Sequence, residues 1–325
     1  MLSPGDAARL PPSAHHLFLG SLAPGTWQSY ATKFRLFAAF CASLPDSPPS
    51  LPASSTTVAR YISHLFDKGT IAAVSLHQYL WPIARAHEDL GLPSPFDRVV
   101  ASLRTGFQKL RAVAPAAAGR RSLQRVPLPA PALLAVFRRG VRALHESDLE
   151  LARACGAVVF SALWFARAGT SAPTRGGDFV FRGGSAFYRE PHFKGRAMLR
   201  PRILRIDPTV WNEPLFVFLK DFWNVFGRHP HSLVFGDPGH LSESAFLTAL
   251  LKTALEAVDV APPPGQAYTS HSLRSCAATA AFSIGVQLPR ILAFGGWKLP
   301  SSAQRYIDPL ARASDAARFF FGHLL

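Results

Sequence analysis

The sequence predicts a mainly α-helical protein with a small β-sheet, divided into two domains. Three observations support this prediction. Apolar residues recur at spacings of three and four along most of the chain, which is the period of a helix with one buried face. One stretch, around a Gly-Gly pair, has the composition of paired strands. A segment rich in alanine and proline interrupts a chain of 325 residues, which is long enough for two domains of ordinary size.

The first domain is expected over residues 15–112 as a helical bundle. Its first helix, over residues 21–44, places aromatic residues and one cysteine on a single face: Trp27, Tyr30, Phe34, Phe37 and Cys41. Further helices are expected over residues 56–68, 75–90 and 96–112. The Ala/Pro segment that follows, residues 113–130, carries arginines and is expected to be a basic linker.

The second domain is expected over residues 131–325 as a mostly helical domain with one small sheet. Strands are expected at Phe179–Phe187 and His192–Ile206, separated by the Gly183-Gly184 turn and a basic bend. Helices are expected over residues 131–145, 147–165, 208–228, 242–258, 270–284, 287–294 and 301–320. This order of elements predicts an α+β domain.

Positive charge is concentrated in three stretches without a single acidic residue. The formal net charge is +15, and residues 98–145, 191–206 and 260–307 hold 19 of the 35 Lys and Arg residues. A solvated surface normally interleaves both signs, whereas a surface that faces phosphates excludes carboxylates. None of the stretches forms a basic amphipathic helix of the type that lies on lipid, so nucleic acid is the expected partner and a membrane is not. The alternative is a chance result of an arginine-rich composition.

The cysteines exclude two classes of protein. Cys41, Cys155 and Cys276 are too few and too scattered for a disulfide framework or a zinc site. We therefore expect an intracellular, reducing compartment.

The most informative motif lies in residues 269–309. Thr269 or Ser270 can cap a helix whose first turn places His271 and Arg274 on one face. Cations there oppose the helix dipole, but beside a phosphate they become useful because a helix N-terminus favours an anion. Gly295 and Gly296 then end a helix before Trp297, and Tyr306 follows nine residues later in a short helix. Taken singly, these are ordinary residues: a solvated histidine, a core tryptophan and a packing phenol.

Together they resemble the signature of the tyrosine recombinases, or phage-type integrases. That family has a His-x-x-Arg pair, a Gly-Gly-Trp or Leu-Gly-His turn, and a nucleophilic tyrosine nine residues after the Trp or His; this chain has His271-Ser-Leu-Arg274, Gly295-Gly296-Trp297 and Tyr306. The segment 165–178 resembles the motif of the family's first catalytic arginine and aligns Arg167 with it. The only lysine between Arg167 and Trp211 is Lys194, which matches the family's hairpin lysine.

The resemblance covers most of residues 15–310 and implies two domains of known type. It implies a SAM-like core-binding domain at the N-terminal end and an α+β tyrosine-recombinase catalytic domain at the C-terminal end. It departs from the family at Thr170, where an acid that supports the active-site arginine is usual. Phe165 and Ala166 replace the family's Gly and Leu.

The resemblance implies DNA strand breaking and rejoining through a 3′-phosphotyrosyl intermediate. The implied catalytic residues are Tyr306, Arg167, Lys194, His271, Arg274 and Trp297. No metal and no nucleotide cofactor is required. The two domains are expected to close as a clamp around double-stranded DNA, with dimers or tetramers on paired sites. Phosphate contacts are expected from Arg98, Arg104, Lys109, Arg111, Arg120, Arg121 and Arg125.

Three functions remain open at this point. The first is a site-specific recombinase, as in DNA integration or excision of a mobile element, in the nucleoid or the nucleus. The second is a DNA-binding protein derived from a recombinase with weakened cleavage, which Thr170 favours. The third is a type IB-like topoisomerase. The apolar C-terminal end is predicted to dock on a neighbouring protomer in the DNA-bound assembly; the alternative is that it covers its own domain.

Overall fold

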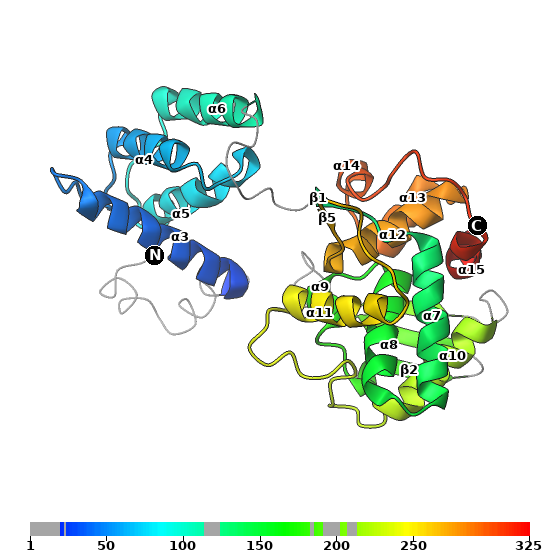
Figure 1. Cartoon of the computed structure of the whole chain (residues 1–325). Helices are drawn as coiled ribbons and strands as arrows, with labels where there is room; N and C mark the ends of the chain where they lie inside the picture. The colour runs from blue at the N-terminus through cyan, green and yellow to red at the C-terminus, as the bar shows by residue number, and fades with distance from the viewer. Residues whose placement is uncertain (1–19, 23, 114–123, 183–184, 191–201, 207–212) are drawn as a thin grey trace. The chain divides into compact units, whose positions relative to one another are not determined.

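The computed structural model describes residues 20–22, 24–113, 124–182, 185–190, 202–206 and 213–325. The chain divides into two compact units between Arg120 and Arg121 (Figure 1). Both units are mainly helical, and the described strands form one three-stranded and one two-stranded sheet. The predicted fold class, mainly α with a small β-sheet, is therefore confirmed.

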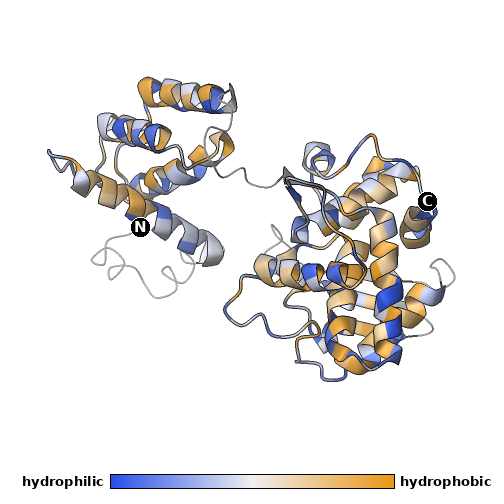
Figure 2. Cartoon of the chain, viewed as in Figure 1, coloured by the Kyte–Doolittle hydropathy of each residue, from blue (hydrophilic) through white to orange (hydrophobic). Residues whose placement is uncertain are grey.

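The described part of the first unit contains the four helices that the apolar spacing predicts and one short helix that it does not. They are α3 (Pro24–Ser43), α4 (Ser55–Lys68), the short η1 (Ala73–Ser75), α5 (Leu76–Asp89) and α6 (Arg98–Val113). Helix α4 begins where the Ser54 side chain accepts the Thr57 N–H and ends at Gly69, whose φ is 69°. These helices carry hydrophobic and hydrophilic residues together (Figure 2), and their apolar faces form one core around Phe37, Tyr61 and Leu76.

The second unit is built around α8 (Leu149–Leu163). Every residue of α8 from Ala154 onward is buried, as expected of a helix that is apolar on all sides. Its other helices are α7 (Ala130–His145), α9 (Ala168–Ser171), α10 (Glu213–Phe226), α11 (Glu243–Glu256), α12 (Ser270–Ser283), α13 (Leu288–Gly295), α14 (Pro300–Gln304) and α15 (Asp315–Phe321), with the short η2 (Gly176–Asp178) and η3 (Gly322–Leu324). Across the described ranges, no helix is long and apolar enough to cross a membrane.

The sheets differ from the prediction in two ways. The expected strand Phe179–Phe187 is two antiparallel strands, β2 (Phe179–Arg182) and β3 (Ser185–Glu190). The expected Gly183-Gly184 turn lies outside the described residues. The third strand, β4 (Arg202–Ile206), pairs antiparallel with β3. An unpredicted pair joins β1 (Gln124–Arg125) in parallel to β5 (Gln266–Ala267), so the end of the expected linker lies against the segment before α12.

The prediction of one helix over residues 301–320 is wrong. The structure has α14 and α15 instead, and Tyr306 lies in the turn after α14 rather than in a helix. Pro309 disfavours a helical conformation at Asp308. The hydroxyl of Thr279 on α12 replaces the missing helical bonds, because it donates to the Tyr306 carbonyl and accepts the Asp308 N–H, both at 3.0 Å.

The C-terminal segment covers its own domain, which is the second of the two alternatives. Phe320 and Phe321 are fully buried. The ring of Phe320 lies 6.1 Å from that of Phe137 on α7, and the ring of Phe321 lies 5.6 Å from that of Phe165. Helix α15 also packs against α12.

Burial of His323 predicts that the stability of this C-terminal segment depends on pH. Burial lowers the pKa of its imidazole to about 3, against an ordinary value of 6.5, and Arg290 acts in the same direction. The folded state therefore keeps His323 neutral while the unfolded chain protonates it below pH ~6.5, so its contribution is full above that pH and is lost as the pH falls. We expect His323→Gln to reduce the loss of unfolding free energy between pH ~7 and ~5, by at most about 1.4 kcal/mol per pH unit. Urea denaturation at both pH values tests this; an unchanged difference would contradict it.

Candidate active site

Two of the predicted site residues lie near the start of α12, in different environments. Thr269 is the N-cap of this helix. Its N–H donates to the Ser272 hydroxyl, and the Ser272 N–H donates to the Thr269 carbonyl. His271 is exposed, whereas Arg274 is only 2% exposed. A guanidinium stays charged at neutral pH, so its burial requires strong partners.

Two helix C-termini supply these partners. Nη1 of Arg274 donates to the carbonyl oxygen of Phe165, and Nη2 donates to that of Gly295 at 2.6 Å. Phe165 follows the end of α8, and Gly295 is the last residue of α13. Carbonyl groups at a helix C-terminus carry partial negative charge, so both ends stabilise the buried cation. Arg274 thereby joins three helices at one point.

The end of α8 has an unusual conformation. Phe165 has a φ of 49°, the left-handed region that favours glycine. The Phe165 N–H donates to the Ala162 carbonyl at 3.0 Å, and the Ala166 N–H donates to the Ser161 carbonyl at 2.9 Å. These two bonds form a Schellman motif, with a bulky residue where glycine is usual. The conformation costs about 1–2 kcal/mol, and the fully buried Phe165 ring offsets this by packing.

The end of α13 has the same motif with the expected residue. Gly296 has a φ of 64°, and the Trp297 N–H donates to the Leu292 carbonyl at 2.9 Å. The Trp297 side chain folds back over Gly295, where an added Cβ would overlap the indole ring. Trp297 is 8% exposed, and its ring centroid lies 4.0 Å from Cζ of Arg274. This is a cation–π contact with a desolvated guanidinium.

Tyr306 lies beside these groups. Its ring centroid is 5.4 Å from that of Trp297, 5.5 Å from Cζ of Arg274 and 6.4 Å from the ring of His271. The phenol is half-buried, and Thr279 fixes its main chain. The structure thus brings together four residues from three separate segments of the sequence. Sequence reasoning did not include Thr279, because one threonine within an alanine-rich helix gives no signal.

Arg167 is close in the chain to Phe165, the residue whose carbonyl accepts from Arg274. It lies two residues after Phe165 and is the N-cap of α9, where its carbonyl accepts the N–H groups of Thr170 and Ser171. Its side chain is half-buried. Lys194 lies outside the described residues.

The position of Thr170, where the resemblance implies an acid, is buried in α9. A carboxylate nevertheless adjoins this helix from another element. Oε2 of Glu243, in the first turn of α11, lies 3.7 Å from the point that a Cβ on Gly169 would occupy. An acid therefore lies beside α9, although not on it.

The predicted phosphate-contacting residues are in different situations. Arg98, Arg104 and Lys109 are exposed on α6. Arg111 instead donates to the Phe66 carbonyl at the end of α4 and stacks 4.8 Å from the Phe66 ring, so it has a structural partner. The main chain of Arg125 belongs to β1. Arg120 and Arg121 lie outside the described residues.

The two cysteines of the second unit, Cys155 and Cys276, are buried and are not expected to react. Burial raises the pKa of the thiols of Cys155 and Cys276 to about 12, which keeps them protonated at neutral pH. Among the residues that the structure describes, no group of three or more His, Cys, Asp or Glu could hold a metal ion.

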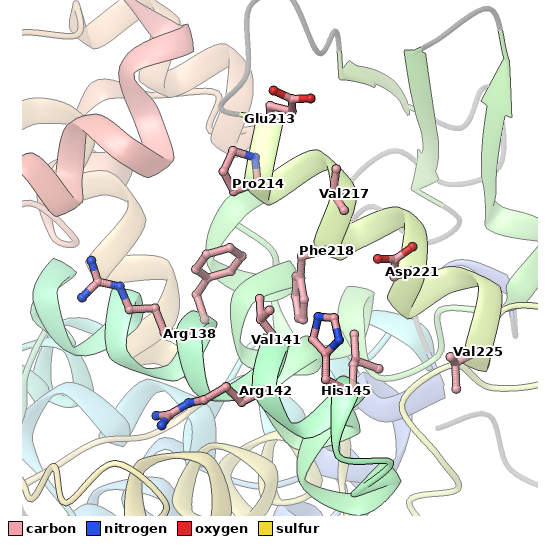
Figure 3. A pocket seen from close by; sticks show the side chains of 12 residues that line it. Arg138, Val141, Arg142, His145, Glu213, Pro214, Val217, Phe218, Asp221 and Val225 are labelled. Atoms are coloured by element: carbon pink, nitrogen blue, oxygen red, sulfur yellow. The ribbon is translucent and has the colours of Figure 1, made fainter.

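Two grooves, each of about 850 Å³, lie in the second unit. One runs between α11 and residues 260–271 and includes Thr269 and His271, so it reaches the cluster. The other lies between α7 and α10, and its lining includes none of the five predicted catalytic residues that the structure describes (Figure 3). Its walls carry Arg138, Arg142 and His145 on α7 and Glu213 and Asp221 on α10.

Comparisons with known proteins establish the fold. No protein-family model matches the sequence, and no curated protein matches it. Solved structures do match. A dimer of lambda integrase (75–356) bound to a COC′ core site is 17% identical, with a TM-score of 0.58 over 93% of this chain and 96% of that chain. The Tn1549 transposon integrase in complex with transposon right end DNA is 12% identical, with a TM-score of 0.56 over 92% and 93%.

The XerH site-specific recombinase bound to a palindromic difH substrate is 14% identical, with a TM-score of 0.56 over 86% of this chain and 75% of that chain. The chain has the tyrosine recombinase fold. At these identities the likeness is one of fold, and it agrees with the resemblance that the motifs indicate.

The surroundings of Gly295 and Gly106 predict that substitution by alanine has opposite effects on stability at the two positions. Gly295→Ala is expected to lower the free energy of unfolding by about 1–3 kcal/mol, because the added methyl displaces the indole. Gly106→Ala in α6 meets nothing within 4 Å and is expected to raise it by up to ~1 kcal/mol. Chemical denaturation of the full chain measures both; a neutral Gly295→Ala would show that the indole is not held there.

Proposed function

We propose that the protein is a site-specific DNA recombinase that cuts and rejoins DNA through a covalent link to Tyr306. The observation that carries this proposal is the cluster of Tyr306, Trp297, Arg274 and His271 within a tyrosine recombinase fold. The DNA complexes of the integrases and of XerH support double-stranded DNA as the substrate. The resemblance in motif spacing supports the same assignment.

The first chemical step is attack of the Tyr306 phenolic oxygen on a backbone phosphorus. The P–Oη bond forms and the P–O5′ bond breaks, which leaves a 3′-phosphotyrosyl link and a free 5′-hydroxyl. The link conserves the energy of the phosphodiester, so a different 5′-hydroxyl can reverse the step and join a new strand. This exchange integrates or excises a DNA segment, and the Tn1549 transposon integrase among the matching structures supports a mobile element.

Negative charge that develops on the non-bridging oxygens requires fixed donors. Arg167 and Arg274 are assigned to this role, and a guanidinium has more N–H groups than the two main-chain bonds of Arg274 use. The indole N–H of Trp297 can donate as a third group but cannot titrate. Preorganised donors of this kind are usually the largest catalytic contribution, each about 3 kcal/mol.

Two proton transfers complete the step. His271, whose ring lies near that of Tyr306, is assigned to accept the phenolic proton or to hold the phosphate. Lys194 is assigned to protonate the leaving 5′-oxygen. No step needs a metal ion or a nucleotide.

DNA binding and assembly extend the proposal to the whole chain. The charge of +15 favours a polyanionic partner, and the exposed cations of α6 favour phosphate contacts from the first unit. Strand exchange requires two or four protomers on paired sites, and the lambda integrase dimer supports such an assembly. The protein would then act where DNA is, in a nucleoid or a nucleus.

A DNA-binding protein with weakened cleavage is the second candidate. The neutral Thr170 at a position where an acid is usual favours it. Relaxation of a supercoiled plasmid without paired sites would instead support a type IB-like topoisomerase.

Covalent capture tests the nucleophile. A nicked duplex library with a randomised recognition region should yield a protein–DNA adduct that survives denaturation, because the short fragment that carries the new 5′-hydroxyl diffuses away after cleavage and cannot reverse the step. We expect Tyr306→Phe to abolish this adduct, since the phenyl ring has no oxygen to attack phosphorus. An adduct that persists in Tyr306→Phe would refute the assignment, and no adduct with the wild type would favour the weakened protein.

The arginines are tested by rate on the sequence that the capture selects. Arg167→Ala and Arg274→Ala are each expected to slow adduct formation at least about a hundredfold while DNA binding is largely kept. Arg60→Ala, at a partly exposed arginine that pairs with Asp46 in the first unit, is the control and should keep the wild-type rate. Equal losses of binding and cleavage would count against a role in the transition state.

The cations of α6 are tested by the salt dependence of DNA binding. Arg104→Ala is expected to reduce the slope of log K against log salt by about 0.9, the value for one lost phosphate contact. Arg60→Ala should leave the slope unchanged, because Arg60 pairs with Asp46 at 2.7 Å. Fluorescence anisotropy with a duplex over a series of salt concentrations provides both slopes, and equal slopes for the two variants would exclude Arg104 from the contact surface.

A further inference from the structure

We infer that Phe165 is a positioning residue for the proposed reaction, and that it orients Arg274 and Trp297 together. This inference rests on the proposed function. Phe165 is not one of the groups that act on DNA in the mechanism above. It nevertheless contacts two of them, through its carbonyl and through its ring, and a third lies two residues further along the chain.

The carbonyl of Phe165 orients the guanidinium of Arg274. Its direction depends on the φ of 49°, which places the residue in the Schellman motif at the end of α8. A right-handed conformation at this residue would continue the helix and turn the carbonyl along its axis, away from Arg274. The backbone conformation of one residue therefore determines where one end of a buried cation is bound.

The ring of Phe165 orients the indole of Trp297. The two rings meet edge to face, with centroids 6.2 Å apart and planes at 85°. The same ring contacts Phe294 of α13 at 5.7 Å and Phe321 of α15 at 5.6 Å. Glycine would provide the backbone conformation without strain, but it would leave the ring's space empty. Phenylalanine at this position therefore supplies packing contacts that glycine would lack, at the cost of backbone strain.

Both contacts act on groups whose positions decide the rate. Arg274 stacks on Trp297, and both face the ring of Tyr306. A displacement of about 1 Å in such donors can cost a hundredfold in rate. The guanidinium of Arg274 and the indole of Trp297 contact each other. We therefore expect that a smaller side chain at Phe165 displaces both donors together.

A matched pair of substitutions separates positioning from ordinary packing. Phe165→Leu and Phe235→Leu make the same chemical change at two buried rings of the same unit. Phe235 contacts Phe160 and Phe222, and neither is a site residue. The first-order rate of adduct formation at saturating DNA is measured for each variant, on the DNA selected by covalent capture.

We expect Phe165→Leu to lower this rate about tenfold or more with little change in DNA affinity, and Phe235→Leu to stay within about threefold of the wild type. Equal losses in the two variants, or an unchanged rate in Phe165→Leu, would overturn the inference. Phe165→Gly, which fits the left-handed conformation, serves if Phe165→Leu does not fold, and the same slower rate is expected.

A second readout does not depend on activity. The chain is labelled with fluorotryptophan, and the ¹⁹F signal of Trp297 is assigned by its loss in Trp297→Phe. Phe165→Leu should shift this signal, because an edge-on ring is removed from the indole, whereas Phe235→Leu should not. If the wild type forms no adduct, the proposed function fails while this measurement still decides whether Phe165 holds Trp297; an unshifted signal would overturn the inference.

Discussion

The buried guanidinium of Arg274 is the interaction on which the rest of the candidate site depends. A cation that is 2% exposed is stable only where hydrogen-bond acceptors and partial negative charge replace its hydration. Here the carbonyl groups at the C-terminal ends of α8 and α13 and the face of Trp297 supply them. Because Arg274 and these partners come from three segments of the sequence, the same contacts that stabilise the charge also assemble the site.

This arrangement makes the site continuous with the hydrophobic core. Phe165 belongs to the core through Phe294 and Phe321, and its carbonyl belongs to the site through Arg274. The C-terminal helix α15 thereby contacts the site through Phe165, although it carries none of the residues assigned to the chemistry. Stability and proposed activity are consequently coupled here, and variants of this core need both measurements.

Much of the fold was predictable because local signals agree with the tertiary structure. The spacing of Trp27, Tyr30 and Phe34 predicted α3, and the Gly295-Gly296 pair predicted the end of α13. The spacing between Trp297 and Tyr306 pointed to a site, but not to the turn in which Tyr306 lies. That turn is fixed by Thr279 from a distant helix, and the left-handed Phe165 is fixed by packing. The spacing of apolar residues indicates neither this tertiary hydrogen bond nor this packing.

The most direct test of this account is to identify the amino acid that carries the DNA. Protein captured on the nicked duplex library is digested with nuclease and protease, and the peptide that retains a nucleotide is sequenced by mass spectrometry. The account predicts a nucleotide joined through its 3′-phosphate to Tyr306. A nucleotide on any other residue, or a 5′-phosphate linkage, would contradict it.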